Sequence, residues 1–391
     1  MICRPDQRPA KPADSLETAN STNPVNAFPA AGQAESVTVV ELKCSAGVKQ
    51  PADLGASLCR LMSPTPDSLS KPSSCCPGPQ ASVTGSARPP NNVRPNSVDP
   101  GKADANPAAD RMVLIAGGQF LMGSDADEGE PSDGEAPARL VTLASFKIDR
   151  TAVSNHEFAR FVRQTGYLSV AEEIGSSFVF AGLLPDDFEP TQGVADAPWW
   201  REVLGACWHR PEGGLSSIDQ RLDHPVVHLS WLDAQAYCEW AGLRLPSEAE
   251  WEYGARGGLA GKRYPWGDEL SPEGVHHCNI WQGQFPNRNT GDDGYTGTAP
   301  VTAFAPNGLG LFNPCGNVWE WCADWFGNTF DGTPLTSPKG PAAGTRRVIR
   351  GGSFLCHESY CNRYRVAARS SNDPMATASH MGFRCAADLA P

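Results

Sequence analysis

The sequence predicts an α+β domain over residues 111–391, with little regular secondary structure and long ordered loops. Three helix-start signals of the capping-box type begin at Ser154, Ser230 and Ser247, and each serine is followed three residues later by an acidic residue. From residue 258 onward, glycine, proline, asparagine, aspartate and tryptophan dominate, and apolar runs are very short. Large aromatic side chains must supply the core where regular elements are few. About 280 residues without an internal linker predict one domain.

Residues 1–110 differ in composition from the rest of the chain. They contain no tryptophan or tyrosine, one phenylalanine, and frequent proline, serine and alanine. Such a segment buries too little apolar surface to offset the entropy lost on ordering, so we predict a disordered N-terminal extension. A short strand over 37–42 and metal binding by Cys75-Cys76 are the weaker alternatives. Whether it is a genuine extension or an upstream translation start, the part before Met62 should not contribute to stability.

The ordered elements are expected to begin near Met112. Apolar residues 113–116 and 119–122 flank a Gly-Gly pair, which predicts a strand, a tight turn and a second strand. Each predicted helix has a capping pair, whose serine we interpret as a cap and not as a nucleophile. The first helix has the capping pair Ser154 and Glu157, an apolar face of Phe158, Phe161 and Val162, and its end at Gly166. The second has the pair Ser230 and Asp233, an apolar face of Ala234, Tyr237, Cys238 and Ala241, and its end at Gly242. The third has the pair Ser247 and Glu250 and ends at Gly257-Gly258. Residues 346–350 predict a strand, which Gly351-Gly352 end by opening a loop.

The charge distribution excludes some classes of partner. The formal net charge is −12, and residues 1–110 contain ten basic and ten acidic residues, so the acidic excess falls on residues 111–391. We expect no nucleic-acid partner, because phosphate binding needs a basic face. No apolar run approaches the roughly 20 residues of a membrane helix, and the N-terminus lacks the apolar stretch of a secretory signal. We therefore expect no membrane partner and a cytoplasmic location.

Cys356 and Cys361 lie five positions apart, among aromatic, basic and small residues. Two such positions point to opposite faces of a strand and lie roughly 140° apart on a helix, so both sulfurs reach one small centre only from an irregular loop. Convergent thiols serve a structural disulfide, a redox-active disulfide or a soft-metal site. Without a paired CxxC motif, two thiolates suit Cu(I) better than zinc. Judged alone, the pair favours an ordinary disulfide.

Residues 351–370 resemble the active-site segment of the formylglycine-generating enzymes, the sulfatase-modifying factor family. Four further blocks resemble the same family in the same order. The first two blocks are His-Pro-Val-Val-His-Leu-Ser-Trp, beginning at His224, and Arg-Leu-Pro-Ser-Glu-Ala-Glu-Trp-Glu-Tyr, beginning at Arg244. The other two are Asn-Ile-Trp-Gln-Gly, beginning at Asn279, and Gly-Asn-Val-Trp-Glu-Trp, beginning at Gly316. The resemblance covers about residues 112–388. The tryptophan-rich blocks mark the superfamily broadly, whereas the cysteine pair in its Gly-Gly-Ser frame is specific for the oxidase.

The resemblance implies a C-type-lectin-like formylglycine-generating-enzyme fold and an oxygen-dependent oxidoreductase. Cys356 and Cys361 would bind Cu(I) as thiolates, the substrate cysteine would be a third ligand, and molecular oxygen would bind near Ser353 and Trp319. Abstraction of hydrogen from the substrate Cβ would give a thioaldehyde, which water converts to formylglycine. The implied partner is a newly made, unfolded sulfatase with a Cys-x-Pro-x-Arg motif, which would bind as an extended peptide along an aromatic groove.

The resemblance also assigns roles to single residues. Tyr360 and His357 are expected at the catalytic centre with the four residues just named. The residues expected to contact the substrate are Trp199, Ser177, Arg363 and His380. Cys238 with Cys385 is the candidate structural disulfide. The remaining cysteines of the domain are interpreted as core or loop thiols without a role, and they are Cys207, Cys278, Cys315 and Cys322.

Oxygen donors in irregular loops suggest that calcium braces the fold, because calcium takes six to eight oxygen ligands, backbone carbonyls included. Spacing alone would make these donors ordinary turn residues, and the resemblance to the family reverses that interpretation. The two implied ligand sets are Asn279, Ile280, Asp293 and Tyr295, and Asn313, Gly316, Val318 and Glu320. The backbone carbonyl would be the ligand at Ile280, Tyr295, Gly316 and Val318.

The sequence departs from the family at the substrate side. Two acidic residues hold the substrate arginine in relatives, and the matching positions here are Ala152 and Ser176. Losing both would remove charge-assisted bonds of about 1.5–3 kcal/mol each. The candidate replacements are Asp149, Glu172 and Glu173. A second departure is His380, where relatives usually carry asparagine.

Two other functions are possible on the same scaffold. One is a non-catalytic peptide- or glycan-binding module, which is disfavoured because Cys356 and Cys361 are both present. The other is an iron-dependent sulfoxide synthase, which needs an added helical domain with a histidine triad. Residues 1–110 cannot supply such a domain.

Overall fold

A computed structural model describes residues 111–126, 128–214, 216–330 and 333–389. The predictions for residues 1–110, including the strand at 37–42 and the Cys75-Cys76 doublet, lie outside the described residues. The helices are α2 (Asn155–Thr165), α3 (Val170–Ile174), α4 (Trp231–Ala241) and α5 (Glu248–Ala255), with short 3₁₀ turns at Pro131–Asp133, Ala181–Leu183 and Pro272–Gly274. The strands are β1 (Met112–Ile115), β2 (Gly118–Met122), β3 (Arg139–Leu143), β4 (Phe146–Asp149), β5 (Ser176–Phe180), β6 (Gly193–Val194), β7 (Ala197–Leu204), β8 (Gly283–Gln284), β9 (Arg288–Asn289), β10 (Trp319–Trp325), β11 (Leu335–Thr336), β12 (Arg347–Arg350), β13 (Arg369–Asn372), β14 (Met381–Gly382) and β15 (Ala386–Asp388).

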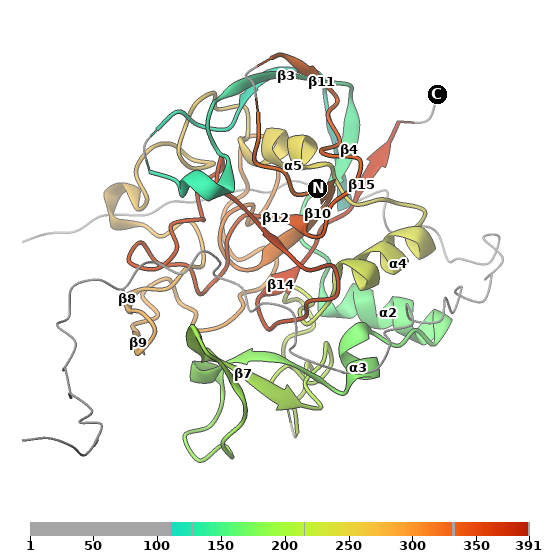
Figure 1. The fold of residues 1–391 in the computed structure, drawn as a ribbon, viewed down its shortest axis with the longest axis vertical. Helices are drawn as coiled ribbons and strands as arrows, with labels where there is room; N and C mark the ends of the chain where they lie inside the picture. The colour runs from blue at the N-terminus through green and yellow to red at the C-terminus, as the bar shows by residue number, and fades with distance from the viewer. Residues whose placement is uncertain (1–110, 127, 215, 331–332, 390–391) are drawn as a thin grey trace, which may run out of the picture. The chain divides into compact units, whose positions relative to one another are not determined.

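The strands form several small sheets, so the predicted α+β class is confirmed. The largest sheet has the order β13-β12-β10-β14, and the others are β1-β4-β15, β11-β3-β2, β5-β7-β6 and the pair β8-β9. In Figure 1 the strands β10, β12 and β14 lie near the centre of the domain, with α5 next to them and α2, α3 and α4 grouped on one side. Between these elements the chain runs in long irregular segments, which the glycine- and proline-rich sequence predicts.

The three helices predicted from capping boxes are confirmed. Ser154, Ser230 and Ser247 each cap a helix, with the reciprocal bond from the acidic residue three positions later. The helix at 170–174 was not predicted, although its cap at Ser169 follows the same rule. The pattern before residue 122 predicts two strands, and both form, but β1 pairs with β4 and β2 pairs with β3 instead of with each other.

The main hydrophobic core carries the cysteine pair. The side chains of Phe158, Phe161 and Tyr237 bring α2 and α4 together through ring contacts at centroid distances of 5.3–6.0 Å. The same cluster of buried side chains continues through Trp319 to Cys356 and Cys361. Large aromatic residues therefore build the core, as the composition predicts.

Candidate active site

The loop that carries the cysteines begins at two glycines with left-handed backbone. Gly351 and Gly352 have φ of 93° and 72° and follow directly on β12. A Cβ at Gly352 would lie 2.9 Å from the carbonyl oxygen of Arg363, and one at Gly351 would lie 3.0 Å from that of Pro314. Both positions therefore require glycine, because a side chain would be strained and would collide with backbone. The predicted end of the strand and start of a loop are confirmed.

The loop brings the two thiols together. The Sγ atoms of Cys356 and Cys361 lie 3.2 Å apart, and both side chains are buried. This separation exceeds the 2.03–2.05 Å of a disulfide bond. A tight turn sets it: the Cys361 N–H donates to the His357 carbonyl at 2.7 Å, and the Cys356 N–H donates to the Ser353 carbonyl at 2.9 Å. The Ser353 N–H also points at the Cys356 sulfur, at 3.4 Å.

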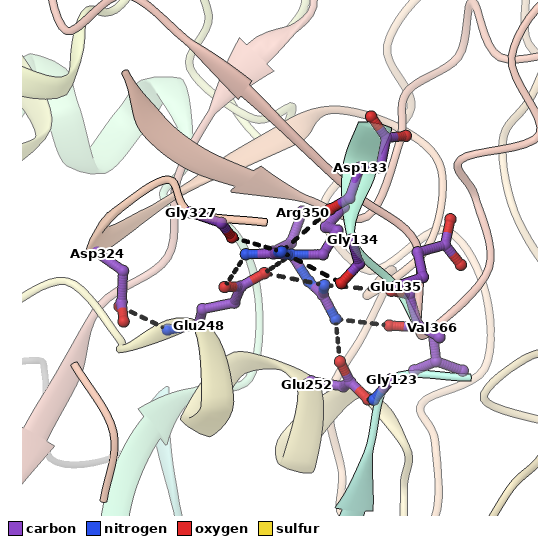
Figure 2. A network of polar contacts seen from close by, with 12 residues as sticks. Gly123, Asp133, Gly134, Glu135, Glu248, Glu252, Asp324, Gly327, Arg350 and Val366 are labelled. Atoms are coloured by element: carbon purple, nitrogen blue, oxygen red, sulfur yellow. Dashed lines mark hydrogen bonds and ion pairs between the residues drawn. The ribbon is translucent and has the colours of Figure 1, made fainter. Parts of the chain in front are cut away.

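Buried arginines fix both ends of this loop. Figure 2 shows the Arg350 guanidinium between the carboxylates of Glu248 and Glu252, with a further bond to the Val366 carbonyl at 2.9 Å. At the other end Arg369 binds Glu248 through two nitrogens, at 2.6 and 2.7 Å. Since α5 carries both glutamates, this helix clamps the strand before the loop and the strand after it.

Arg363 and Arg365, inside the loop, also form buried ion pairs. Arg365 binds Glu135 through two bonds of 2.7 Å, and Arg363 Nε donates to Asp133 at 2.5 Å. Asp133 and Glu135 lie in a segment more than 200 residues away in the sequence. Arg363 is almost completely buried, so this contact makes it a support of the loop. Its expected contact with the substrate stays a prediction.

Aromatic rings cover the loop at Tyr360. The Tyr360 ring stacks on Phe285, with centroids 4.4 Å apart and planes 8° from parallel. Trp199, which is half-buried, meets both rings edge-on at 5.0 and 5.2 Å. The neighbouring Trp281 N–H donates to the Cys356 carbonyl at 3.1 Å. Trp199 and Tyr360 therefore lie together, and Phe285 is a component that the sequence analysis missed.

Trp319 and His380 lie on two paired strands beside the loop. Trp319 begins β10 and its N–H donates to the His380 carbonyl at 2.9 Å, next to the parallel pairing with β14. The indole Nε1 of Trp319 is buried and has no hydrogen-bond partner among the described residues. The His380 ring packs on Trp200 at 4.6 Å. Burial lowers the pKa of His380 to about 3, although the charge interaction with Cys361 acts to raise it. The imidazole is therefore neutral.

Ser177 belongs to a buried chain of polar side chains. Its hydroxyl lies 2.8 Å from His228 Nδ1 and 2.8 Å from the Thr377 hydroxyl. Burial, the main cause, lowers the pKa of His228 to about 4, so this histidine is also neutral. The expected substrate contact of Ser177 stays a prediction, because its side chain is completely buried.

The carboxylates that could replace the missing acidic pair at the substrate arginine differ in burial and in their existing partners. Asp149 is buried and bound to Arg111 at 2.6 Å; burial raises its pKa to about 6 although Arg111 opposes this. Glu173 is exposed. At one of the two expected acidic positions, Ser176 donates a hydrogen bond to Glu202 at 2.8 Å. Glu202 is thus a carboxylate beside that position, and it could not be predicted from the sequence because the pairing of β5 with β7 places it there.

His357 faces the polar side of the loop. Its Nδ1 lies 2.8 Å from the Ser359 hydroxyl and accepts from the Ser359 N–H at 3.2 Å. Its carbonyl accepts from both Tyr360 and Cys361. The backbone of His357 therefore shapes the turn that brings the thiols together, and a catalytic role for its imidazole stays a prediction.

The first expected calcium set converges on Asp293. One carboxylate oxygen accepts from the Ile280 N–H at 3.0 Å, and the other accepts from the Tyr295 N–H at 3.0 Å. Asn279 donates to the Gly297 carbonyl at 2.8 Å in the same pair of loops. A carboxylate oxygen has lone pairs beyond one such bond. The structure thus brings this set together in a manner that fits a calcium ion.

The second expected set has an open buried oxygen at Asn313. The Asn313 Oδ1 is buried without a partner among the described residues, while its amide nitrogen donates to Val301 and Pro300. The Glu320 carboxylate accepts three bonds, from Arg384 to both oxygens at 2.6 and 2.7 Å and from the Trp251 indole at 2.7 Å, and the Asp293 carboxylate accepts three as well. Calcium binding by this second set therefore stays a prediction. Gly316 and Val318 remain predicted carbonyl ligands.

Cys238 and Cys385 are neighbours but free thiols. Their sulfurs are 3.6 Å apart, both side chains are buried, and burial raises the pKa of Cys385. The expected disulfide therefore stays a prediction that needs only a small approach of the two sulfurs.

No helix among the described residues is long and apolar enough to cross a membrane.

Comparisons with known proteins agree with this architecture. Residues 98–389 match the family described as sulfatase-modifying factor enzyme 1-like domain. A formylglycine-generating enzyme of Thermomonospora curvata is 61% identical over 282 residues, which cover 71% of this chain and 93% of that protein. A mouse protein named inactive C-alpha-formylglycine-generating enzyme 2 is 44% identical over 279 residues, 70% of this chain and 85% of that protein.

One solved structure is similar throughout the domain. The structure of PvdO from Pseudomonas aeruginosa superimposes with a TM-score of 0.53 at 27% identity, covering 71% of this chain and 94% of that chain. The C-type-lectin-like formylglycine-generating-enzyme fold implied by the sequence is thereby confirmed.

Proposed function

This chain belongs to the sulfatase-modifying factor enzyme 1-like family, and from that premise we propose that it converts a cysteine of newly made sulfatases to formylglycine. The cysteine would lie in a Cys-x-Pro-x-Arg motif, molecular oxygen would be the oxidant, and Cu(I) the cofactor. In overall balance one thiol, one O₂ and two hydrogens from an external thiol reductant give one aldehyde, one H₂S and one water.

The observation that carries the proposal is the convergence of two buried thiols. Cys356 and Cys361 lie 3.2 Å apart, in a loop that ion pairs hold at both ends. Two soft ligands in an apolar site suit Cu(I), which accepts few ligands. Bound copper would supply the one-electron and oxygen chemistry that no side chain provides.

The remaining residues would position substrate and oxygen. The rings of Trp199, Phe285 and Tyr360 offer an aromatic surface beside the loop, which suits an extended peptide. The buried Trp319 indole N–H has no partner among the described residues, so it could donate a hydrogen bond to bound oxygen. The neutral His380 adds no charge to this apolar surrounding, so it can replace an asparagine.

A calcium ion at Asp293 would have a bracing role. The segment 279–282 carries the Trp281 N–H that binds the Cys356 carbonyl, and it also contacts Asp293. Calcium at this point would therefore stabilise one wall of the site without taking part in the chemistry.

The second candidate, a non-catalytic binding module, gains support from the 44% identical relative whose name calls it inactive. The two functions differ in what they consume. With copper loaded and a Cys-x-Pro-x-Arg peptide added, the proposed oxidase takes up oxygen in step with peptide conversion. A binding module would retain the peptide and consume no oxygen, and that result would reverse the assignment.

A further inference from the structure

We propose that Glu172, Cys207 and His209 form a zinc site separate from the cysteine-pair centre. A sulfur, an imidazole nitrogen and a carboxylate oxygen of these residues all lie within 4.8 Å of one another. Cys207 and His209 come from the turn after β7, and Glu172 comes from α3. Cys207 and His209 have no part in the proposed oxidation, and Glu172, a candidate for holding the substrate arginine, would serve the metal instead. The sequence alone gives only an isolated Cys-x-His, because its third member lies 35 positions earlier.

The two separations from His209 match a tetrahedral zinc site. Zinc binds thiolate at about 2.3 Å and imidazole or carboxylate at about 2.0–2.2 Å, so tetrahedral angles place neighbouring ligand atoms about 3.4–3.6 Å apart. His209 Nδ1 lies 3.4 Å from Cys207 Sγ and 3.7 Å from Glu172 Oε1. The third pair, Cys207 Sγ and the Glu172 carboxylate, lies within 4.8 Å, so a shared ion would draw these two atoms together by up to about one ångström.

The surroundings orient two of the ligands in advance. Glu172 Oε2 accepts from the Ser169 hydroxyl at 2.8 Å, from the Ser169 N–H at 2.9 Å and from the Trp208 indole at 3.2 Å. This leaves Oε1 directed to His209. Reciprocal backbone bonds of 3.1 Å between Cys207 and Arg210 close the turn that holds the sulfur and the imidazole side by side. Such supporting bonds around metal ligands raise affinity.

Burial and charge favour a transition-metal ion over calcium. The Cys207 sulfur is buried, and 34% of the His209 side chain is exposed, so a fourth position is open to water. One thiolate and one carboxylate together neutralise a divalent ion. The neighbouring Arg210 side chain is exposed, so water screens its charge. Sulfur and nitrogen donors suit zinc, whereas calcium takes oxygen donors.

A bound ion would join α3 to the turn after β7 at one end of the antiparallel pair β5 and β7. β5 begins just after α3, and β7 ends just before the turn with Cys207, while the two strands pair along their length. The Gly205 N–H already donates to the Gly175 carbonyl at 2.8 Å between these ends. Zinc at this point would hold this end of the pair together. Because β7 carries Trp199, the ion would stabilise the aromatic surface from outside the site.

Cobalt and zinc binding test this proposal on the full chain. Chelator-treated protein is titrated with Co²⁺, which reports a thiolate ligand by its charge-transfer band, and then with Zn²⁺ in competition. We expect the wild type to show this band and the visible bands of tetrahedral cobalt. Cys207→Ser should remove the charge-transfer band of this site, and His209→Gln should lower zinc affinity by more than about 100-fold. The matched control is His156→Gln, since His156 is exposed on α2.

Thermal melts supply the second measurement. Zinc should raise the Tm of the wild type and of His156→Gln, and should leave that of His209→Gln unchanged. His209 is partly exposed, so the variant should melt like the wild type when both are metal-free. Equal zinc uptake and equal cobalt spectra in the wild type and Cys207→Ser would overturn the proposal, as would a wild type that takes up no zinc.

Discussion

Glu248→Gln removes the carboxylate that holds both ends of the cysteine loop. Glu248 binds Arg350 at 3.1 Å and Arg369 through two bonds of 2.6 and 2.7 Å, and all three side chains are buried. Glutamine has nearly the same size, so the change removes the charge and leaves little cavity. Breaking a buried ion pair on one side costs about 3–5 kcal/mol, because the remaining charge stays buried.

The expected cost can be expressed as a shift in melting temperature. An unfolding entropy of about 2.1 cal/mol/K per residue gives roughly 0.6 kcal/mol/K for the domain. The Tm of Glu248→Gln should therefore fall by roughly 5–8 °C in scanning calorimetry at pH 7. Glu239→Gln, an exposed position on α4 with one surface bond from Gln235, is the matched control and should change by about 1 °C or less.

The effect should also depend on pH with a definite sign. Burial alone would raise the pKa of Glu248, but Arg369 and Arg350 hold it below its ordinary value. A carboxylate with a lowered folded pKa stabilises the protein above its unfolded pKa of about 4.3, and that stabilisation is lost as pH falls through the folded value. The difference between wild type and variant should thus shrink below pH 4. A Tm within 1 °C of the wild type at pH 7 would refute the reasoning.

Three further predictions follow from the site. Trp319→Phe removes the indole N–H, which has no partner in the described part of the chain, and keeps the aromatic bulk, so the KM for oxygen should rise several-fold in oxygen-uptake assays; an unchanged KM would remove Trp319 from the oxygen pocket. Because Ala152 and Ser176 lack carboxylates, lysine should replace the peptide arginine with less than about tenfold loss of kcat/KM; a loss of several orders of magnitude would show that another carboxylate, with Glu202 the first candidate, holds the guanidinium. Calcium removal by chelator should lower the Tm of the wild type more than that of Asp293→Asn, and identical melts would contradict the calcium site.

Local chemistry predicted much of the fold. The three capping boxes gave their helices because the cap and the first turn satisfy each other within four residues, without help from the rest of the chain. The same pattern at Ser169 was overlooked, since its helix has only five residues and no apolar periodicity. Strand pairing was not predictable: β1 and β2 are separated by two residues yet belong to different sheets.

In the candidate site, too, local features could be predicted from the sequence and long-range contacts could not. The Gly-Gly pair and the cysteine spacing indicated a loop with convergent thiols, and the loop has this form. The partners that fix it could not be predicted, because they come from distant segments: Asp133 and Glu135 lie 230 positions before Arg363 and Arg365. Phe285 reaches Tyr360 in the same way. A sequence shows which residues can carry chemistry, whereas long-range packing decides which of them meet.

The central claim is that Cys356 and Cys361 together carry the oxidation. The most direct test mixes copper-loaded protein with a Cys-x-Pro-x-Arg peptide and a thiol reductant in air, and follows the peptide by mass spectrometry. The wild type should lower the peptide mass by about 18 Da, the change from thiol to aldehyde, and Cys278→Ser, which changes another buried thiol, should do the same. Cys356→Ser and Cys361→Ser should each leave the peptide unchanged, and wild-type conversion by Cys361→Ser would contradict the account.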